Sequence, residues 1–379
     1  MRINNTQLRS FHPLFFAVFL TFFSSLCFAH DNKQATRLPV DDVKGDLSVM
    51  VLGSGGPAVT ADGRASAGYL IFTDGQPRIL MDVGGGVHKN FVSSGANIKD
   101  LDIILLSHLH IDHMGDLSPV VKALYFQNRA FNLLNGTVDD GDERTAPIRI
   151  FGPDQNGIGF PDKLGANPGV TQYPSIDEFV RSHYDLNTGD ERYLNAFTGA
   201  ISAGKFAVTS HKVSPVWTSY NPEVIINEKG LKVTAVGVNH GPVPALAFRI
   251  EYKGKSIVYS GDTSSRSVDT AGNPLPNGGN MVAIAKDADL LIYDTAIMND
   301  APNGPNDGIF FQLHTTPNRM GEVVTAARVK KLVLSHITAI TQSRLGEVAD
   351  LVRAQGFTGK ISAAHDLQVY NVGLHDRHH

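Results

Sequence analysis

Short apolar runs, each broken by glycine or proline, dominate the chain from residue 47 onward. Residues 101–107 (LDIILLS) form a predominantly apolar run, which is typical of a strand covered on both faces. Residues 87–95 predict a short helix, and residues 117–146 begin with helical spacing and continue into an acidic loop. The predicted strands of this first half are residues 47–57, 67–72, 78–86, 101–107 and 148–153.

A second β-rich series fills the rest of the chain. Its predicted strands are residues 205–213, 231–240, 245–262, 288–296, 331–336 and 359–372. Two alternating runs flank EYKGKS, so a hairpin is expected with Gly254 at its turn. Residues 316–330 and 343–356 have helical spacing, with Pro317 at a first-turn position. Two β-rich halves that each end in helices predict an α/β fold of the α+β type, a four-layer αββα sandwich.

The stretch between the two series is irregular. Residues 154–205 are rich in glycine, proline and asparagine, with one helix candidate around residues 176–186. A stretch of this length without regular structure is typical of a lid or another functional loop. We therefore expect residues 117–230 to contain a long insertion that walls a substrate pocket.

The first thirty residues resemble a targeting segment. Arg2 and Arg9 precede an almost wholly apolar run at residues 13–28, and Ala29 closes a small-residue end. This run is too short to span a bilayer comfortably, so we expect a secretory signal peptide at residues 1–29, with an uncleaved anchor as the alternative. Cleavage after Ala29 would remove Cys27, the only cysteine, and a chain without thiols suits an oxidising compartment. The prediction is a periplasmic or secreted protein with a flexible leader at residues 30–46, a folded domain at residues 47–372 and a tail at residues 373–379.

Composition excludes several classes of protein. The 379 residues are 42% hydrophobic and 18% charged, which excludes a disordered chain, a collagen and a disulfide scaffold. The net charge of −4 provides no overall basic field, so an obligate nucleic-acid partner is not expected. No later run is apolar enough for a membrane span.

The buried run at residues 101–107 leads directly into a cluster of metal-binding residue types. His108, His110, Asp112 and His113 lie within six residues of one another. Such groups are not packed in a core without partners, so their side chains are expected to converge on an electrophile. Imidazole and carboxylate ligands suit Zn²⁺, and alternate residues of an extended segment point the same way. The cluster therefore predicts a metal site that can serve two adjacent ions.

This cluster is the HxHxDH signature of the metallo-β-lactamase superfamily, which the chain resembles over residues 47–372. His240, Asp262 and His336 each follow a predicted strand, where that fold gathers its ligands. The resemblance implies the superfamily's αββα sandwich and two Zn²⁺ per chain, with Mn²⁺ or Fe²⁺ as substitutes. The implied ligands of one ion are His108, His110 and His240, those of the other are Asp112, His113 and His336, and Asp262 would bridge the two.

Within the superfamily, the chain looks most like the ribonuclease Z and arylsulfatase-like branch. Residues 52–71, 238–263 and 313–337 carry this likeness, the last through His314 and the Thr-Thr-Pro that follows it. The chain also departs from that branch. Only Met114 separates the motif from the next glycine, and the span from His240 to Asp262 has no room for a tRNA-gripping arm. Tyr293-Asp294 stands where the branch usually has His-Glu.

The resulting hypothesis is an exported dinuclear zinc hydrolase in which a hydroxide shared by the metals attacks a small ester-type substrate. A phosphodiester or an aryl sulfate is favoured over a lactone or a β-lactam. Asp112 would orient the nucleophile, and His314 is the expected proton donor to the leaving group. The alternatives are a ribonuclease Z-like nuclease if the chain is not exported, a di-iron oxidoreductase and a non-catalytic metal-binding protein. The expected partner is a small molecule, and a homodimer is possible by analogy.

Overall fold

The computed structural model describes residues 37–58, 60–97, 101–124, 147–159, 172–185, 189–190, 192, 207–300 and 308–372. The predicted signal peptide, residues 30–36 of the leader and the tail at residues 373–379 lie outside these ranges. The fold is that of the compact unit that begins at Leu38. Within the described ranges, no helix has the length and apolar character needed to cross a membrane.

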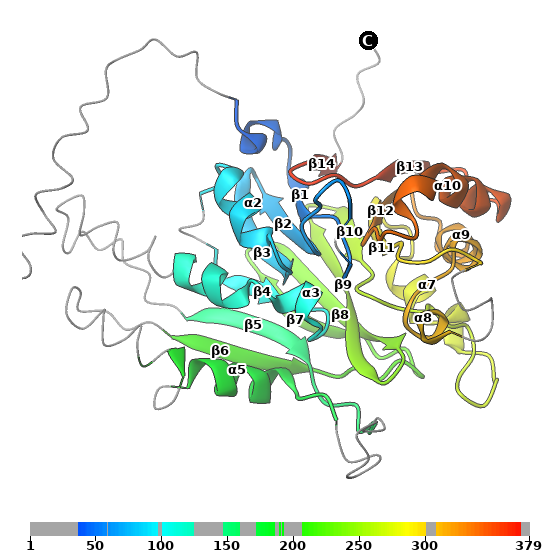
Figure 1. Ribbon diagram of the computed structural model, residues 1–379, viewed down its shortest axis with the longest axis horizontal. Coiled ribbons are helices and arrows are strands. Elements are labelled where there is room, and N and C mark those ends of the chain that lie inside the picture. The colour runs from blue at the N-terminus through cyan, green and yellow to red at the C-terminus, as the bar shows by residue number, and fades with distance from the viewer. Residues whose placement is uncertain are drawn as a thin grey trace, which may run out of the picture. The chain divides into compact units, whose positions relative to one another are not determined.

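Two seven-stranded mixed sheets form the centre of this unit (Figure 1). The first sheet has the order β14-β1-β2-β3-β4-β5-β6, and the second has the order β13-β12-β11-β10-β9-β8-β7. The first sheet comprises β1 (Leu47–Gly53), β2 (Gly68–Thr73), β3 (Gln76–Val83), β4 (Ile103–Leu105), β5 (Ile148–Pro153), β6 (Val208–Val213) and β14 (Val369–Val372). The second comprises β7 (Glu223–Glu228), β8 (Leu231–His240), β9 (Val243–Tyr252), β10 (Lys255–Tyr259), β11 (Leu290–Asp294), β12 (Lys331–Ser335) and β13 (Lys360–Ala363).

Helices cover the outer faces of both sheets (Figure 1). On the first sheet lie α2 (Val87–Ser93), α5 (Ile176–Tyr184) and a helical stretch at residues 117–124. On the second lie α7 (Asn280–Ile284), α9 (Pro317–Ala326) and α10 (Leu345–Ala354). The shorter helices are α3 (Ile111–Met114), α8 (Ile309–Leu313), η2 (Pro39–Asp42), η3 (Pro276–Gly278) and η4 (Gln342–Arg344). The four-layer αββα sandwich predicted from the sequence is confirmed.

Alternation along the strands explains the layers. In β1, Val49 and Val51 face the core between the two sheets, while Met50 and Leu52 face the core beneath the helices. A strand covered on both faces has no polar side, which is why its sequence is a continuous apolar run. The predicted hairpin is also present, because β9 and β10 are joined by a turn in which Gly254 has a φ of +73°.

Two features of the topology differ from the expected strands. The predicted closing strand at residues 359–372 is two strands, and β13 and β14 belong to different sheets. An unpredicted strand, β7, pairs antiparallel with β8 at the edge of the second sheet. Together with β5 and β6, it means that residues 117–230 contribute three strands to the sandwich.

Candidate metal centre

The predicted metal ligands follow strands whose ends meet at one edge of the sandwich. Strands β3 to β6 run parallel to one another in the first sheet, as do β10 to β13 in the second. The carboxyl ends of parallel strands share an edge, which is where open α/β sheets bind ligands. His108 follows β4, Asp262 follows β10 and His336 follows β12. Residues separated by more than two hundred positions in the chain therefore meet.

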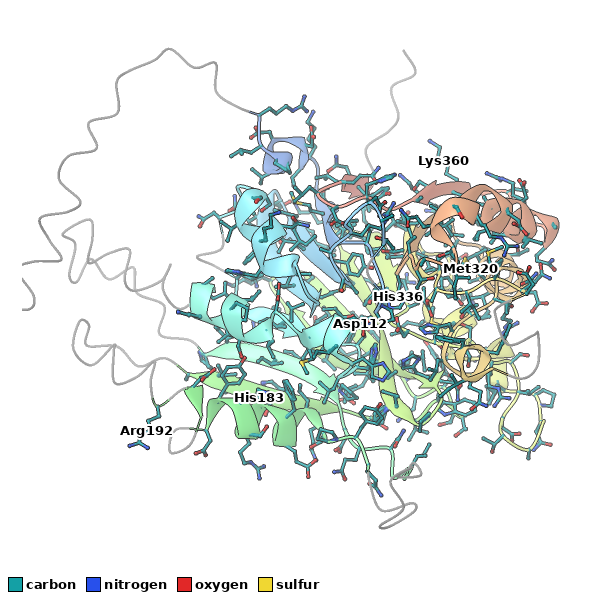
Figure 2. All side chains as sticks on the ribbon, viewed as in Figure 1. Asp112, His183, Arg192, Met320, His336 and Lys360 are labelled. Atoms are coloured by element: carbon teal, nitrogen blue, oxygen red, sulfur yellow. The ribbon has the colours of Figure 1, made fainter. Side chains whose placement is uncertain are left out.

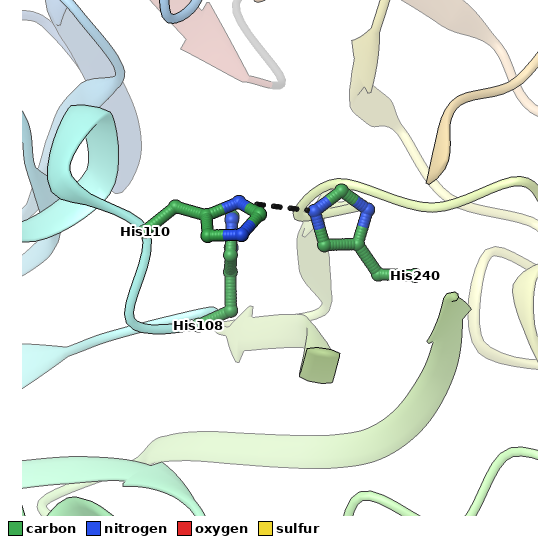
Figure 3. A group of neighbouring side chains, drawn as sticks. All are labelled: His108, His110 and His240. Atoms are coloured by element: carbon green, nitrogen blue, oxygen red, sulfur yellow. Dashed lines mark hydrogen bonds between the residues drawn. The ribbon is translucent and has the colours of Figure 1, made fainter. Parts of the chain in front are cut away.

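The first group consists of His108, His110 and His240 (Figure 3). His240 Nε2 lies 3.3 Å from His110 Nδ1, and the His108 ring is 4.7 Å from each of the other two ring centres. Burial lowers the pKa of His240 to about 3 and holds that of His108 well below its usual range. Both rings are thus neutral near pH 7, which is the form that binds metal ions.

The second group consists of Asp112, His113, Asp262 and His336. His336 Nε2 lies 3.1 Å from His113 Nε2 and 3.2 Å from Asp112 Oδ2, and Figure 2 shows Asp112 and His336 close together at the centre of the molecule. One carboxylate oxygen connects the two groups: Asp262 Oδ2 is 3.2 Å from His336 Nε2 and 3.8 Å from both His108 Nε2 and His240 Nε2. Asp262 therefore lies between the two groups, which is where the shared ligand is expected.

The cluster fits divalent cations better than it fits a packed core. His108 Nε2 and Asp262 Oδ1 are both buried, and neither has a hydrogen-bond partner among the residues that the structure describes. Buried polar atoms without partners are costly, so native proteins rarely keep them without a ligand or a water. Five imidazoles and two carboxylates form a nitrogen and oxygen donor set that suits zinc.

Four of the five imidazoles are also hydrogen-bonded on the side that faces away from the cluster, and the fifth, that of His336, only approaches a carboxylate there. Partners of this kind set the tautomer and the orientation of a metal-binding histidine. The partners are Ser107 Oγ for His108 Nδ1 (3.1 Å), Tyr173 Oη for His110 Nε2 (3.0 Å), Asp82 Oδ2 for His113 Nδ1 (2.7 Å) and the Leu313 carbonyl for His240 Nδ1 (2.7 Å), while His336 Nδ1 lies 3.4 Å from Asp294 Oδ1. None of these five was predicted from the sequence as a partner of a metal ligand.

Asp82 is the most connected of these partners. It is fully buried at the end of β3, with a left-handed φ of +52°. Besides the His113 imidazole, its carboxylate accepts hydrogen bonds from the Ser107 amide and hydroxyl and from the Tyr259 hydroxyl, each at 2.7 Å. The available signal in the sequence was an aspartate in the otherwise apolar run ILMDVGGG.

His314, the predicted proton donor, is paired with a carboxylate. It lies between α8 and α9, with its Nδ1 2.8 Å from Asp294 Oδ2, and only 5% of the residue is exposed. Its ring centre is 5.4 Å from those of His240 and His336, so it lies beside both groups. Burial alone would lower the pKa of His314, but the Asp294 carboxylate outweighs burial and raises it. In the sequence, Tyr293-Asp294 stands out only as a departure from the branch, yet Asp294 supplies the carboxylate of this pair.

Comparison with known proteins identifies the family and its relatives. The profile of the metallo-beta-lactamase superfamily matches residues 61–336. A ribonuclease Z of Mycolicibacterium paratuberculosis is 24% identical over 324 residues, which cover 85% of this chain and 96% of that protein. A ribonuclease Z of Archaeoglobus fulgidus is 25% identical over 309 residues, which cover 77% and 87%. The crystal structure of human tRNase Z, short form, shares the fold with a TM-score of 0.54 at 18% identity, over 86% of this chain and all of that one.

These relatives overturn part of the functional hypothesis. The interpretation as a hydrolase of small ester-type substrates, with no obligate nucleic acid, is wrong, because proteins aligned along most of the chain are named ribonuclease Z. The ribonuclease Z-like alternative fits better. The error has a physical cause: the same ligand set serves hydrolases of many esters, and a net charge of −4 excludes an overall basic field without excluding local contacts to phosphates.

Proposed function

The chain belongs to the metallo-β-lactamase superfamily and is a metal-dependent hydrolase, and from this premise we propose that it is a ribonuclease Z-like enzyme that cleaves phosphodiester bonds in RNA. The observation that carries the proposal is the length of the alignment with ribonucleases Z, which covers 85% of this chain and 96% of one such protein. The superfamily profile itself, at residues 61–336, takes in both ligand groups and His314. The pairing of His314 with Asp294 beside these groups supports it, because an acid is useful where a ribose oxygen leaves.

We assign the two groups to two zinc ions, for which Mn²⁺ or Fe²⁺ could substitute. His108, His110 and His240 would hold one ion, Asp112, His113 and His336 would hold the other, and Asp262 would contact both. Ions bound there would supply Lewis acidity toward a phosphoryl oxygen and lower the pKa of water to near neutrality.

The residues of the chain have separate tasks in this proposal. The Asp112 carboxylate, 7% exposed at the edge of the second group, accepts a hydrogen bond from the attacking water and orients it toward phosphorus. His314 donates a proton to the departing ribose oxygen. Asp294 accepts from His314 Nδ1, keeps the ring in one orientation and favours its protonated form.

Apolar side chains next to these residues suit contact with a nucleobase. Ile111 lies between His110 and Asp112 and is 75% exposed. The Phe310 ring is 37% exposed and nearly parallel to the His314 ring, at 6.5 Å between ring centres. Aromatic side chains that stack on bases are a general means of binding single-stranded RNA without reading its sequence.

The test is hydrolysis of RNA by the full chain loaded with zinc. We expect endonucleolytic cleavage of an RNA in which a folded stem is followed by a single-stranded 3′ extension. Asp262→Ala should abolish cleavage, whereas His211→Gln, on edge strand β6 and outside both groups, should leave it unchanged. Turnover of p-nitrophenyl sulfate or a lactone by a protein that does not cleave any RNA would overturn the proposal.

Export stays a prediction, because residues 1–29 are outside the described part of the chain. Fractionation of cells that produce the full chain, with the N-terminal residue of the mature protein determined, tests it. Recovery in the periplasm with residue 30 at the N-terminus is the result that export predicts, and it would remove the condition of no export under which the ribonuclease Z-like alternative was stated. Recovery of the full-length chain in the cytoplasm would contradict export.

A further inference from the structure

One of the histidine partners comes from a peripheral segment. Tyr173 lies just before α5, and its hydroxyl is 3.0 Å from His110 Nε2. The two rings meet at a steep angle of 66°, with 5.6 Å between their centres. By contrast, Ser107 and Asp82 belong to the strand ends beneath the cluster. His110 is therefore oriented by a part of the chain that is separate from the sheet edge.

His110 is also the most exposed member of the two ligand groups. The other six residues are buried, whereas His110 is partly exposed. It turns Nδ1 toward His240, while His240 turns its Nε2 toward the cluster. If His110 donates its Nε2 proton to the Tyr173 hydroxyl, Nδ1 keeps a lone pair directed at the cluster.

The segment around Tyr173 is firmly attached to the first sheet. Ser175 caps α5: its hydroxyl accepts from the Glu178 amide at 3.3 Å, and the Glu178 carboxylate accepts from the Ser175 amide at 2.8 Å. Ile176 is fully buried against Gly152, where even a Cβ would lie within 3.0 Å of the Ile176 side chain. A residue two positions from this anchor can thus hold a hydroxyl in place.

We propose that Tyr173 is a positioning residue that fixes the tautomer and orientation of His110 and thereby sets the metal affinity of the first group separately from that of the second. This inference rests on the metal centre assigned above but not on RNA as the substrate. It predicts that the two metal ions bind with unequal strength, and that the ion at His108, His110 and His240 depends on the segment before α5.

Tyr173→Phe tests the inference, because it removes the hydroxyl and keeps the ring. The matched control is Tyr184→Phe in α5, whose hydroxyl lies 3.2 Å from Ser118 Oγ. Metal-free full-length protein is titrated with zinc in competition with a chromophoric chelator, and the absorption spectrum of the cobalt-loaded protein is recorded. We expect Tyr173→Phe to weaken one of the two binding steps by about 10- to 100-fold and to alter the cobalt spectrum, while the control matches the wild type.

Several outcomes would overturn the inference: two unchanged binding steps in Tyr173→Phe, an equal loss in Tyr184→Phe, or equal weakening of both steps. If Tyr173→Phe does not fold, the zinc affinities of His110→Ala and of the double variant His110→Ala/Tyr173→Gln are compared instead. The change at Tyr173 should weaken zinc binding no further once the His110 imidazole is gone. These titrations contain no RNA, so they decide the role of Tyr173 independently of the substrate. A protein that binds two zinc ions without cleaving RNA would refute only the proposed substrate. A wild-type chain that binds no zinc would overturn both.

Discussion

The pair formed by His314 and Asp294 yields the sharpest test of the proposed chemistry. His314→Ala removes the proposed acid, and Asp294→Asn keeps the shape of its partner while removing the charge. The carboxylate is buried and also accepts a hydrogen bond from the Ala296 amide at 3.1 Å, so it is held in place without His314. Asp294→Asn therefore empties no volume, whereas His314→Ala empties the volume of one buried imidazole.

The expected size of the effect follows from the role. A positioned general acid contributes about 10²- to 10⁴-fold to a rate, which corresponds to about 3–5 kcal/mol of transition-state stabilisation. His314→Ala should lower kcat for RNA by that factor with little change in KM. The double variant should be no slower than His314→Ala alone, because Asp294 acts through His314.

The sign of the pH dependence is fixed by the cause of the pKa shift. The donor must be protonated, and the Asp294 carboxylate raises the pKa of His314 against the effect of burial. The wild type therefore keeps its acid form to higher pH than an ordinary histidine would. In Asp294→Asn, the alkaline limb of the kcat profile should move to lower pH.

The assay compares two leaving groups on the same variants. A ribose oxygen needs a proton as it departs, whereas p-nitrophenolate does not. His314→Ala should thus lose RNA cleavage and keep hydrolysis of bis-p-nitrophenyl phosphate within a few-fold of the wild type, with zinc content unchanged. An equal loss on both substrates would refute the role of His314 as an acid and indicate that it shapes the metal centre.

Three further predictions concern the metal centre and its surroundings. Gly84→Ala should lower the thermal unfolding temperature and the activity, because the added Cβ would lie 2.0 Å from the Asp112 carbonyl oxygen. Gly85→Ala should change neither, because its added Cβ meets nothing within 4 Å, and equal effects of the two variants would contradict this steric cause. Zinc uptake should release protons and strengthen from about pH 6 to about pH 8, because burial lowers the pKa of His336 but the Asp262 carboxylate raises it to about 10 without metal. Calorimetry in two buffers measures the proton release, and a zinc affinity that does not change with pH would contradict the prediction. Phe310→Ala should raise KM for RNA by about 5- to 150-fold, the equivalent of about 1–3 kcal/mol of stacking, and leave hydrolysis of bis-p-nitrophenyl phosphate unchanged.

Much of the fold could be predicted because a buried strand is visible in its own sequence as a run of apolar residues. Residues 103–106 and 332–334 are apolar without interruption, and they make up most of β4 and β12. β7 could not be predicted in this way. Its sequence, EVIINE, is largely exposed along the edge of the second sheet, and it becomes a strand through pairing with β8. A local pattern records burial, but it does not record pairing at an edge.

The candidate site likewise contains residues that the local sequence indicates and residues that only the packing of the elements brings in. The seven predicted ligands could be located because their residue types stand in a recognised motif or at strand ends, and the structure brings all seven together. Their partners could not be located. Tyr173 lies 63 positions from His110, and Asp82 lies 31 positions from His113. Nothing in the sequence near either partner indicates which imidazole it meets, since that depends on how the elements pack.

The substrate posed a different problem, because the residues that carry out hydrolysis are not those that select what is hydrolysed. A centre of this kind can polarise the oxygen of many esters, so even correct ligands left the leaving group open. Near-neutral charge argued against a nucleic acid, yet net charge does not record local contacts to phosphates. If those contacts are few, the affinity for RNA should depend only weakly on salt. Selection would instead come from groups such as Phe310 and Ile111, which touch no proposed metal and remain exposed beside the residues that do. The substrate of this protein is thus to be sought at the entrance of the metal centre, by varying the base that Phe310 would meet.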